Sequence, residues 1–477
     1  MLEYKEKFPL TSVALAYLTG RDAKTELGGN ATGFYAEFQG NCEAQRLEMA
    51  INRVIARQPM LRTLLFSDGT QAELTKIPVY QLPVTDLQNY TCEEIEAFFQ
   101  KLRAEESHRI FQLESWPMFN FSFYLLPGGK SRVVISFDMM LMDRFSIEIL
   151  VRELNAFYRE ERGPLKPLPH SYQDYVNLVE DERRDNGEGD RKFWEQRIPH
   201  MPPAPPIAMK REGNSGGRFT SRVKVYGREQ YQSLQERLYD NHILPSVYML
   251  YCYGKCLSRF SSANDMSVSM TIAHRAPMGH VFSDLIGDFT KLLLVDLHWD
   301  AEENWIDGCR ALHRRIKEYM KHTAFDGLDV MKEFAREHQL SGKAVFPFAF
   351  TSSLASQDES HWHFLGDVVY QISRTPQLAV DCQISEHRGQ LEIRWDCLKG
   401  ILSDQFLDSM FWHYVDLVEK TIDGQDSHAG IDIDRIALYN KTAADIPSRT
   451  LQTLFENQAA KTPSNPALSV DGETYTY

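Results

Sequence analysis

The segment Val133–Leu154, VVISFDMMLMDRFSIEILVREL, most constrains the fold, because its apolar pattern changes period in the middle. The mostly apolar run VVISF before Asp138 is typical of a buried strand. After Asp143, apolar residues recur every three to four positions, as they do along one side of a helix. The segment is therefore predicted to be a strand-to-helix unit of an α/β protein, with a carboxylate at each end of an apolar loop.

Two roles for these aspartates are open from the spacing alone. An aspartate directly before an amphipathic helix is a favoured N-cap, which gives Asp143 a structural role. Asp138 ends the strand, and the short loop also lets both carboxylates reach one wall of a catalytic site. The segment itself does not decide between the structural and the catalytic role.

Composition sets the broad class of protein. A chain of 477 residues exceeds one ordinary core and predicts two or three domains. Its net charge of −14 repels phosphate backbones, so no nucleic-acid partner is expected. The charged N-terminus and the lack of an apolar run of about 18 residues predict neither a signal peptide nor a membrane span. Seven scattered cysteines favour free thiols in a reducing cytoplasm and no metal site.

Local composition also divides the chain. The charged, glycine-containing DERRDNGEGDRK and the proline-rich PHMPPAPP are typical of linkers rather than cores. Beyond them, PSVYMLYCYGKCLSRF predicts a helix with Ser246 as its N-cap. The predicted parts are an N-terminal lobe at 1–175, a linker or crossing region at 176–218, a C-terminal lobe at 219–437, an interdomain linker at 438–450 and the start of a further domain at 451–477.

Two predicted strands of the second lobe carry the strongest candidates for chemistry. In AVFPFAFTSSL the phenylalanines alternate onto one face, and Thr351 lies on the other, smaller face, either as an ordinary β-former or as part of a cavity wall. In QLAVDCQI, which forms a predicted hairpin with LEIRWD, Asp381 has hydrophobic neighbours and must face water, a partner or a wet cavity. Partial burial raises the pKa of a carboxyl group, so Asp381 is a candidate general acid and base.

Other motifs carry less information. His361 and His363 in HWH share a strand face, but no third ligand is evident and no metal site is predicted. No G-x-S-x-G motif supports a nucleophilic serine. The stretch GDFTKLLLVD predicts a core strand and no more.

Seven motifs nevertheless occur in a fixed order: FPLTSVALAYLTGR, RQPMLR, D-x-x-x-x-D followed by Ser146, FW with PPAPP, GDFT, PFAFTSSL and SRTPQLAVD. Together they resemble the motif series of heterocyclization domains of nonribosomal peptide synthetases. Related condensation domains have H-H-x-x-x-D-G where this chain has Asp138, Met139, Asp143 and Arg144. The tail from Leu451 resembles the first residues of an adenylation domain.

The resemblance implies an α/β fold of two chloramphenicol-acetyltransferase-like lobes in a V-shaped pseudo-dimer with a central tunnel. An upstream donor carrier domain and a downstream acceptor carrier domain would present substrates on 4′-phosphopantetheine arms, and the domain itself would bind no cofactor. An adjacent adenylation domain would belong to the same synthetase. The implied reaction joins a donor acyl or peptidyl thioester to cysteine, serine or threonine, and then cyclodehydrates the amide to a thiazoline or oxazoline.

The resemblance also implies roles for individual residues. Asp381 would transfer the protons, and Thr351 would position it. Asp143 would form a structural ion pair with Arg275, while Asp138 would brace the active-site wall. Ser146 completes the aspartate motif, and the candidate tunnel or substrate contacts are Gln377, Gln383, Ser352 and His274.

Two alternatives are weighed against this function. A domain that only condenses would be expected to have a second histidine, where this chain has Met139. An inactive module that only docks carrier domains would be expected to lose Asp143 or Asp381, and both are present.

Overall fold

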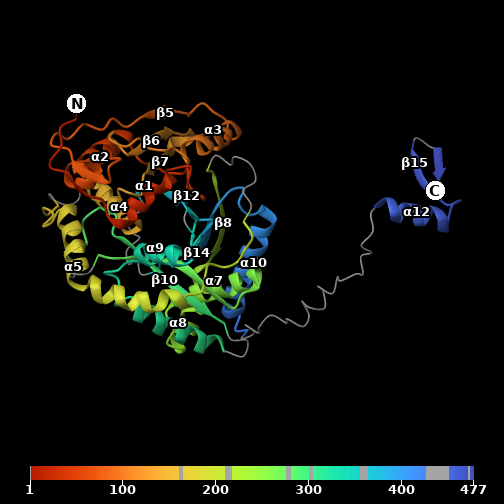
Figure 1. Cartoon of the computed structure of the whole chain (residues 1–477). Coiled ribbons are helices and arrows are strands. Elements are labelled where there is room, and N and C mark those ends of the chain that lie inside the picture. The colour runs from red at the N-terminus through yellow and green to blue at the C-terminus, as the bar shows by residue number, and fades with distance from the viewer. Residues whose placement is uncertain are drawn as a thin grey trace. The chain divides into compact units, whose positions relative to one another are not determined.

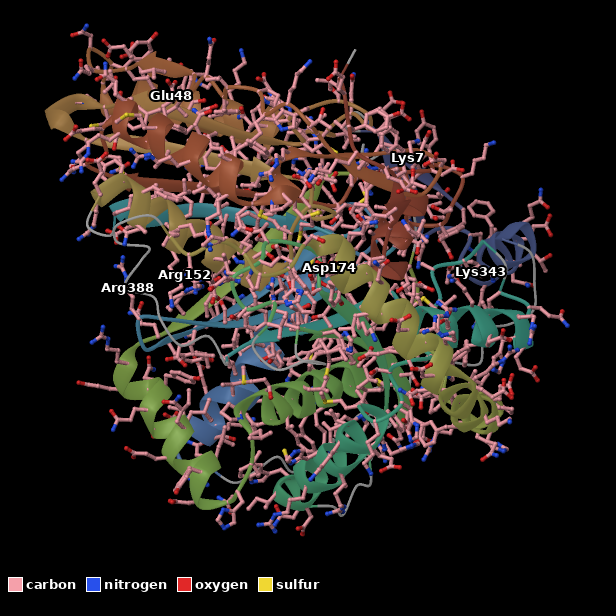
Figure 2. All side chains as sticks on the ribbon, turned by 90° about the vertical axis from the view of Figure 1, so that its left-hand side faces the viewer. Lys7, Glu48, Arg152, Asp174, Lys343 and Arg388 are labelled. Carbon is pink, nitrogen blue, oxygen red and sulfur yellow. The ribbon has the colours of Figure 1, made fainter. Side chains whose placement is uncertain are left out.

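The computed structural model divides the chain into two compact units, Met1–Ala429 and Gly430–Tyr477. The structure describes residues 2–160, 165–209, 217–275, 281–299, 304–340, 342–354, 364–425, 451–470 and 473–477. Within the first unit, an N-terminal lobe and a C-terminal lobe, each of helices and sheet, are stacked on one another (Figure 1). Seen from the side, Glu48 marks the first lobe and Arg388 the second (Figure 2). The predicted α/β class is confirmed.

The N-terminal lobe is built on a five-stranded sheet in the order β12-β2-β7-β6-β5. Its helix α2 buries Leu47, Ile51 and Val54 on one side, as their helical spacing predicts. The elements of this lobe are β1 Phe8–Pro9, α1 Ser12–Gly20, β2 Gly33–Gly40, α2 Ala44–Arg57, the 3-10 turn η1 Pro59–Arg62, β3 Thr63–Leu65, β4 Thr70–Glu73, β5 Val84–Asp86, α3 Cys92–Glu106, β6 Phe119–Leu125, η2 Pro127–Gly129, β7 Ser131–Phe137 and α4 Arg144–Arg159.

The C-terminal lobe is built on a six-stranded sheet in the order β10-β9-β11-β13-β14-β8. Its central strand β11 is parallel to β13, and β13 forms the predicted hairpin with β14. The elements are η3 Ile198–His200, β8 Phe219–Tyr226, α6 Arg228–Asp240, α7 Pro245–Ser261, β9 Asp265–Ala273, β10 Thr290–His298, α8 Trp305–Tyr319, α9 Gly327–Glu337, β11 Phe348–Ser353, β13 Val380–His387, β14 Gln390–Leu398 and α10 Asp404–Ile422.

Strand β12 (Asp367–Arg374) belongs to the second half of the sequence but to the sheet of the first lobe. It pairs with β2 in antiparallel register, with Gln371 opposite Ala36. Gly366 begins the excursion with a φ of +99°, and a Cβ there would lie 2.0 Å from the carbonyl oxygen of Gln39. The bounds 1–175 and 219–437 stay our proposal for the two lobes, with β12 as a strand exchanged from the second to the first; residues 426–437 lie outside the described residues.

The predicted linker or crossing region at 176–218 stays a prediction, but its first part is not loop, because residues Tyr172–Arg197 form one helix, α5. A capping box at Ser171 starts this helix, and Trp194 is buried near its end. Ion pairs one turn apart, such as that of Arg191 with Glu195, stabilise its charged middle. The charged residues and glycines of this segment are typical of a linker, but in the structure they form the exposed side of a long helix.

The N-cap of α7 also differs from the prediction. The helix begins at Pro245, Leu244 is the N-cap, and no side chain caps the first turn. Proline at the first helical position needs no hydrogen-bond partner for its nitrogen, so Ser246 is already inside the helix. Among the described residues, no helix has the length and apolarity needed to cross a membrane.

The second unit is described from Leu451 onward. It contains helix α12 (Leu451–Lys461) and an antiparallel pair, β15 (Pro466–Val470) and β16 (Glu473–Thr476). The predicted interdomain linker at 438–450 lies outside the described residues, as do His361 and His363.

Candidate active site

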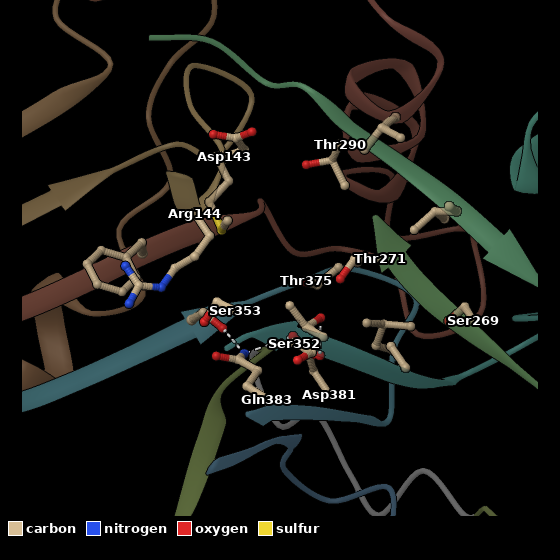
Figure 3. A pocket seen from close by; sticks show the side chains of 18 of the residues that line it. Asp143, Arg144, Ser269, Thr271, Thr290, Ser352, Ser353, Thr375, Asp381 and Gln383 are labelled. Carbon is tan, nitrogen blue, oxygen red and sulfur yellow. Dashed lines mark hydrogen bonds between the residues drawn. The ribbon is translucent and has the colours of Figure 1, made fainter. Parts of the chain in front are cut away.

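A cavity of about 190 Å³ lies between the two lobes of the first unit. That space far exceeds the roughly 15 Å³ that one water molecule needs, so it can hold the reacting ends of larger substrates. Figure 3 shows Asp143 and Arg144 of the first lobe on one side, and Asp381 and Gln383 of the second lobe on the other. Other lining residues are Val13, Tyr17, Met139, Thr290, Thr351 and Ser373.

Thr351 and Asp381 meet because β11 and β13 run side by side. The parallel register places Ala349 next to Asp381 and Thr351 next to Gln383. The Thr351 hydroxyl donates a hydrogen bond of 3.1 Å to Oδ1 of Asp381. Both side chains line the cavity, so the contact predicted from the motifs is present.

The environment of Asp381 favours its protonated form. The side chain is buried, and burial raises its pKa to about 6, helped by the nearby charge of Asp396. Hydrogen bonds from Gln383 and Thr351 act in the opposite direction. A carboxyl group with this pKa can both give and take a proton near neutral pH.

Gln383 connects two carboxylates rather than only facing a substrate. Its Nε2 donates to Oδ2 of Asp381 at 2.8 Å and to Oδ2 of Asp396 at 3.2 Å. The same nitrogen donates to the Ser373 hydroxyl at 2.6 Å. Asp396 was not predicted, and the observed register of β13 and β14 places it directly across from Asp381.

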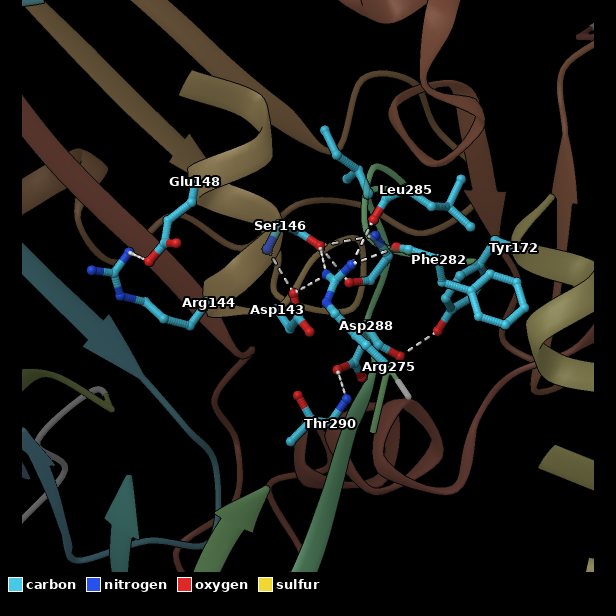
Figure 4. A network of polar contacts seen from close by, with 12 residues as sticks. Asp143, Arg144, Ser146, Glu148, Tyr172, Arg275, Phe282, Leu285, Asp288 and Thr290 are labelled. Carbon is cyan, nitrogen blue, oxygen red and sulfur yellow. Dashed lines mark hydrogen bonds and ion pairs between the residues drawn. The ribbon is translucent and has the colours of Figure 1, made fainter. Parts of the chain in front are cut away.

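On the opposite wall, Asp143 is held by a buried polar cluster (Figure 4). It is the N-cap of α4, and its Oδ1 accepts from the Ser146 backbone at 2.7 Å and from Arg275 at 2.6 Å. Arg275 also donates to the Ser146 hydroxyl at 2.7 Å and to the Leu285 carbonyl at 2.8 Å. The predicted ion pair therefore exists, and it joins the first lobe to the second.

Asp288 is a second residue that the sequence interpretation missed. It belongs to GDFT, which predicted only a core strand. Its Oδ1 accepts from the Thr290 backbone at 3.1 Å, and its buried Oδ2 has no hydrogen-bond partner in the described part of the chain. Burial raises its pKa to about 7, and the charge of Asp143 acts in the same direction. Asp288 is not among the described residues that line the cavity.

Asp138 lies deeper than the cavity wall. Its side chain has no exposed surface and forms an ion pair with Arg21, from the first motif. Its Oδ1 accepts from the Met140 backbone at 3.0 Å, which fixes the loop that carries Met139 into the cavity. The predicted bracing role fits these contacts, and direct contact with a substrate does not.

The remaining candidate contacts separate into two groups. Ser352 and Gln377 line the cavity, and Gln377 has a left-handed backbone with φ of +65°. His274 is not among the described lining residues. Its ring lies 3.3 Å from Lys291 and from Glu182, and burial lowers its pKa to about 3. No set of metal-binding side chains occurs in the part of the chain that the structure describes.

Comparisons with known proteins place this geometry in a family. The chain matches the family model described as Condensation domain over residues 31–430. Bacitracin synthase 1 of Bacillus licheniformis is 30% identical over 486 residues, which cover 99% of this chain and 9% of that protein. Phenyloxazoline synthase MbtB of Mycobacterium bovis is 28% identical over 499 residues, which cover 99% of this chain and 34% of that protein. The chain thus spans only a minor part of these relatives.

A solved structure shares the fold. The EpoB NRPS cyclization-docking bidomain from Sorangium cellulosum has a TM-score of 0.79 and 27% identity, covering 87% of this chain and 85% of that chain. The match confirms the predicted pair of chloramphenicol-acetyltransferase-like lobes.

Proposed function

The chain belongs to the condensation domain family, and from this premise we propose that it is a heterocyclization domain of a nonribosomal peptide synthetase. It joins a donor acyl or peptidyl thioester to a carrier-bound cysteine, serine or threonine and then closes the new amide to a thiazoline or oxazoline. The observation that carries the proposal is Asp381, a buried carboxyl group in the cavity between the lobes, with a pKa near 6 and a hydrogen bond from Thr351.

The similar proteins support ring formation by their names. MbtB is called a phenyloxazoline synthase, and the EpoB structure is that of a cyclization domain. Condensation-type domains of such synthetases transfer acyl groups between substrates held on phosphopantetheine arms. We propose that an upstream carrier domain supplies the donor arm and a downstream carrier domain the acceptor arm, and that an adenylation domain follows in the same synthetase.

The first step forms the amide. The amine of the acceptor residue attacks the donor thioester carbonyl, the C–N bond forms, and the C–S bond breaks to leave the donor arm as a free thiol. This step needs the two arms to meet in the cavity with their reacting atoms in contact, which supplies much of the rate by proximity alone.

The second step closes the ring and removes water. The acceptor thiol or hydroxyl adds to the new amide carbonyl. Its proton passes to the carboxylate of Asp381 and from there to the former carbonyl oxygen, which becomes a carbinol hydroxyl. The carboxylate then takes the proton of the ring nitrogen and gives it to this hydroxyl, which leaves as water while the C=N bond forms. One carboxyl group with a pKa of about 6 can serve both relays, and it ends as the carboxylate that it was at the start.

A reconstituted reaction tests the proposal. Loaded donor and acceptor carrier domains are mixed with the chain, and the tethered product is followed by mass. The expected product has lost one water beyond the condensed amide. In Asp381→Asn, we expect ring formation to slow by about 10²- to 10⁴-fold while amide formation continues, because only the second step needs that proton donor.

The matched control is Asp408→Asn, which removes an exposed carboxylate that pairs with Arg222 on the far border of the same sheet. It is expected to form rings at the rate of the unchanged chain. Amide without ring from the unchanged chain would contradict cyclisation, and rapid ring formation by Asp381→Asn would contradict the assignment of this residue.

A further inference from the structure

Asp396 lies directly behind Asp381 and has no part in the reaction described above. The two residues are cross-strand neighbours in the β13–β14 pair. Asp381 lines the cavity, whereas Asp396 is 1% exposed and is not among the described lining residues. Asp396 therefore acts on the reaction, if at all, through the groups between it and the cavity.

The hydrogen bonds of the two carboxylates are unequal. Asp396 accepts from the Ser373 backbone at 2.9 Å, from the Ser373 hydroxyl at 2.8 Å, from Gln383 at 3.2 Å and from the Ser221 hydroxyl. Among the described residues, the side chain of Asp381 accepts only from Thr351 and Gln383. Each donor favours the charged form of a buried carboxylate, so Asp396 is the member of the pair that keeps the negative charge.

Two adjacent buried carboxylates do not readily carry two charges, because like charges at short range repel strongly in a medium of low dielectric constant. A proton taken up by the pair therefore resides on the member with fewer donors, which is Asp381. Burial raises the pKa of Asp396 as well, and the nearby Arg394 guanidinium opposes that change. The same charge on Asp396 raises the pKa of Asp381.

We propose that Asp396 is a positioning residue for ring formation, whose fixed charge, held next to the shared Gln383 amide, keeps a proton on Asp381 until the carbinol hydroxyl departs. This role rests on the proposed heterocyclization. Without that charge the pKa of Asp381 is lower, and the carboxyl group holds the proton that it takes from the substrate less firmly before the hydroxyl departs. Gln383 holds both carboxylates in place, since its one amide nitrogen donates to each of them.

The other ionisable groups near the pair do not replace this charge. They are Tyr17 of α1, Tyr253 of α7, Cys382 of β13 and Cys397 of β14 around Asp381, and Arg394 of β14 and Tyr370 of β12 around Asp396. Burial raises the pKa of each of these tyrosines and cysteines, so they stay neutral where Asp381 titrates. Asp396 is the nearby group that supplies a negative charge.

The test measures the pH dependence of ring formation, separately from amide formation, in the loaded full chain with its carrier domains. In Asp396→Asn the midpoint assigned to Asp381 is expected to move down by about one pH unit, because a neighbouring negative charge is gone. In Gln383→Met the midpoint is expected to move up, because the charged form of Asp381 loses a donor. Shifts of opposite sign are not expected if these residues only maintain the fold.

Amide formation by the same protein preparations shows that each variant is folded, and Asp408→Asn should keep the original midpoint. Unmoved midpoints in Asp396→Asn and Gln383→Met, or midpoints that move together, would overturn the role of Asp396 while leaving heterocyclization intact. If the unchanged chain forms amide but never a ring, both proposals fall together. If Asp396→Asn does not fold, Gln383→Met decides alone. An unmoved midpoint for Asp381 in that variant would overturn the proposed arrangement, in which Gln383 holds both carboxylates.

Discussion

Two pairs of buried carboxylates lie on opposite sides of the cavity, Asp143 with Asp288 and Asp381 with Asp396. In each pair one carboxylate has strong donors and the other has few. On the first wall the well-bonded Asp143 faces the cavity, and the proton-binding Asp288 is hidden. On the second wall the order is reversed, with Asp381 toward the cavity and Asp396 behind it.

This difference shows why a raised pKa alone does not identify a catalytic group. Asp288 has the higher pKa of the two protonated candidates, about 7 against about 6 for Asp381. Only Asp381 lines the cavity, where a substrate can exchange a proton with it. On the other wall, Arg275 forms an ion pair with the cavity-facing member, Asp143, and makes it part of the framework.

The largest expected effect concerns that framework. Arg275→Ala leaves the buried Asp143 without its cation and should lower the free energy of unfolding by about 3–5 kcal/mol. Urea denaturation followed by fluorescence measures the loss. The control Arg152→Ala breaks the exposed ion pair with Asp284 and should cost at most about 1 kcal/mol. Equal losses of unfolding free energy in Arg275→Ala and Arg152→Ala would mean that the ion pair of Asp143 with Arg275 does not stabilise the first wall.

The second prediction concerns how much the buried carboxyl group of Asp381, on the other wall, lowers the free energy of unfolding. The folded pKa of Asp381, about 6, lies above the ordinary value for aspartate. From about pH 4 to pH 6 the folded chain therefore binds a proton that the unfolded chain has lost, and stability falls as the pH rises. Asp381→Asn does not ionise, so it should be more stable than the unchanged chain by about 1–3 kcal/mol at pH 7.5.

That gain should disappear near pH 4, where both proteins are neutral at this position. Thermal denaturation of both proteins at the two pH values measures it. If Asp381→Asn is no more stable at pH 7.5 than the unchanged chain, the charged form of Asp381 does not destabilise the fold. Asp408→Asn, which removes an exposed carboxylate, is the matched control at both pH values.

The smallest expected effect separates positioning from proton transfer within the second wall. Thr351→Val keeps the shape of the side chain and removes the hydrogen bond to Asp381. One such bond is worth about 1 kcal/mol, so ring formation should slow by about 5- to 10-fold while amide formation is unchanged. Thr351→Ser, which keeps the hydroxyl, should recover most of the rate. A Thr351→Val variant as slow as Asp381→Asn would give Thr351 a direct part in the chemistry.

The local parts of this arrangement were accessible from sequence. The period change around Asp143 predicts β7, the loop and α4, and the alternation in AVFPFAFTSSL places Thr351 on the smaller face of its strand. The odd position of an aspartate in an apolar strand led to Asp381. In each case the relevant information lies within a few neighbouring residues.

The parts that sequence did not provide depend on contacts between distant segments. Asp288 lies just before β10, in a stretch whose local pattern predicts only a core strand, and its neighbours Asp143 and Arg275 come from other parts of the chain. No periodic pattern in the sequence shows that β12 belongs to the sheet of the other lobe. The helix α5 was missed for a different reason, since tertiary packing of Trp194 and capping at Ser171 outweigh its linker-like composition.

The exchange of β12 bears on how such domains can be recombined. Ser373 of this strand binds the hidden Asp396 by its backbone and its hydroxyl, while the strand itself completes the first lobe's sheet beside β2. A chimaera joined near residue 219 would bring a foreign edge strand to that sheet. Half-domain swaps should therefore transplant β2 and β12 together. Otherwise β12, which carries Ser373 to Asp396, would have to pair with a β2 strand from a different protein.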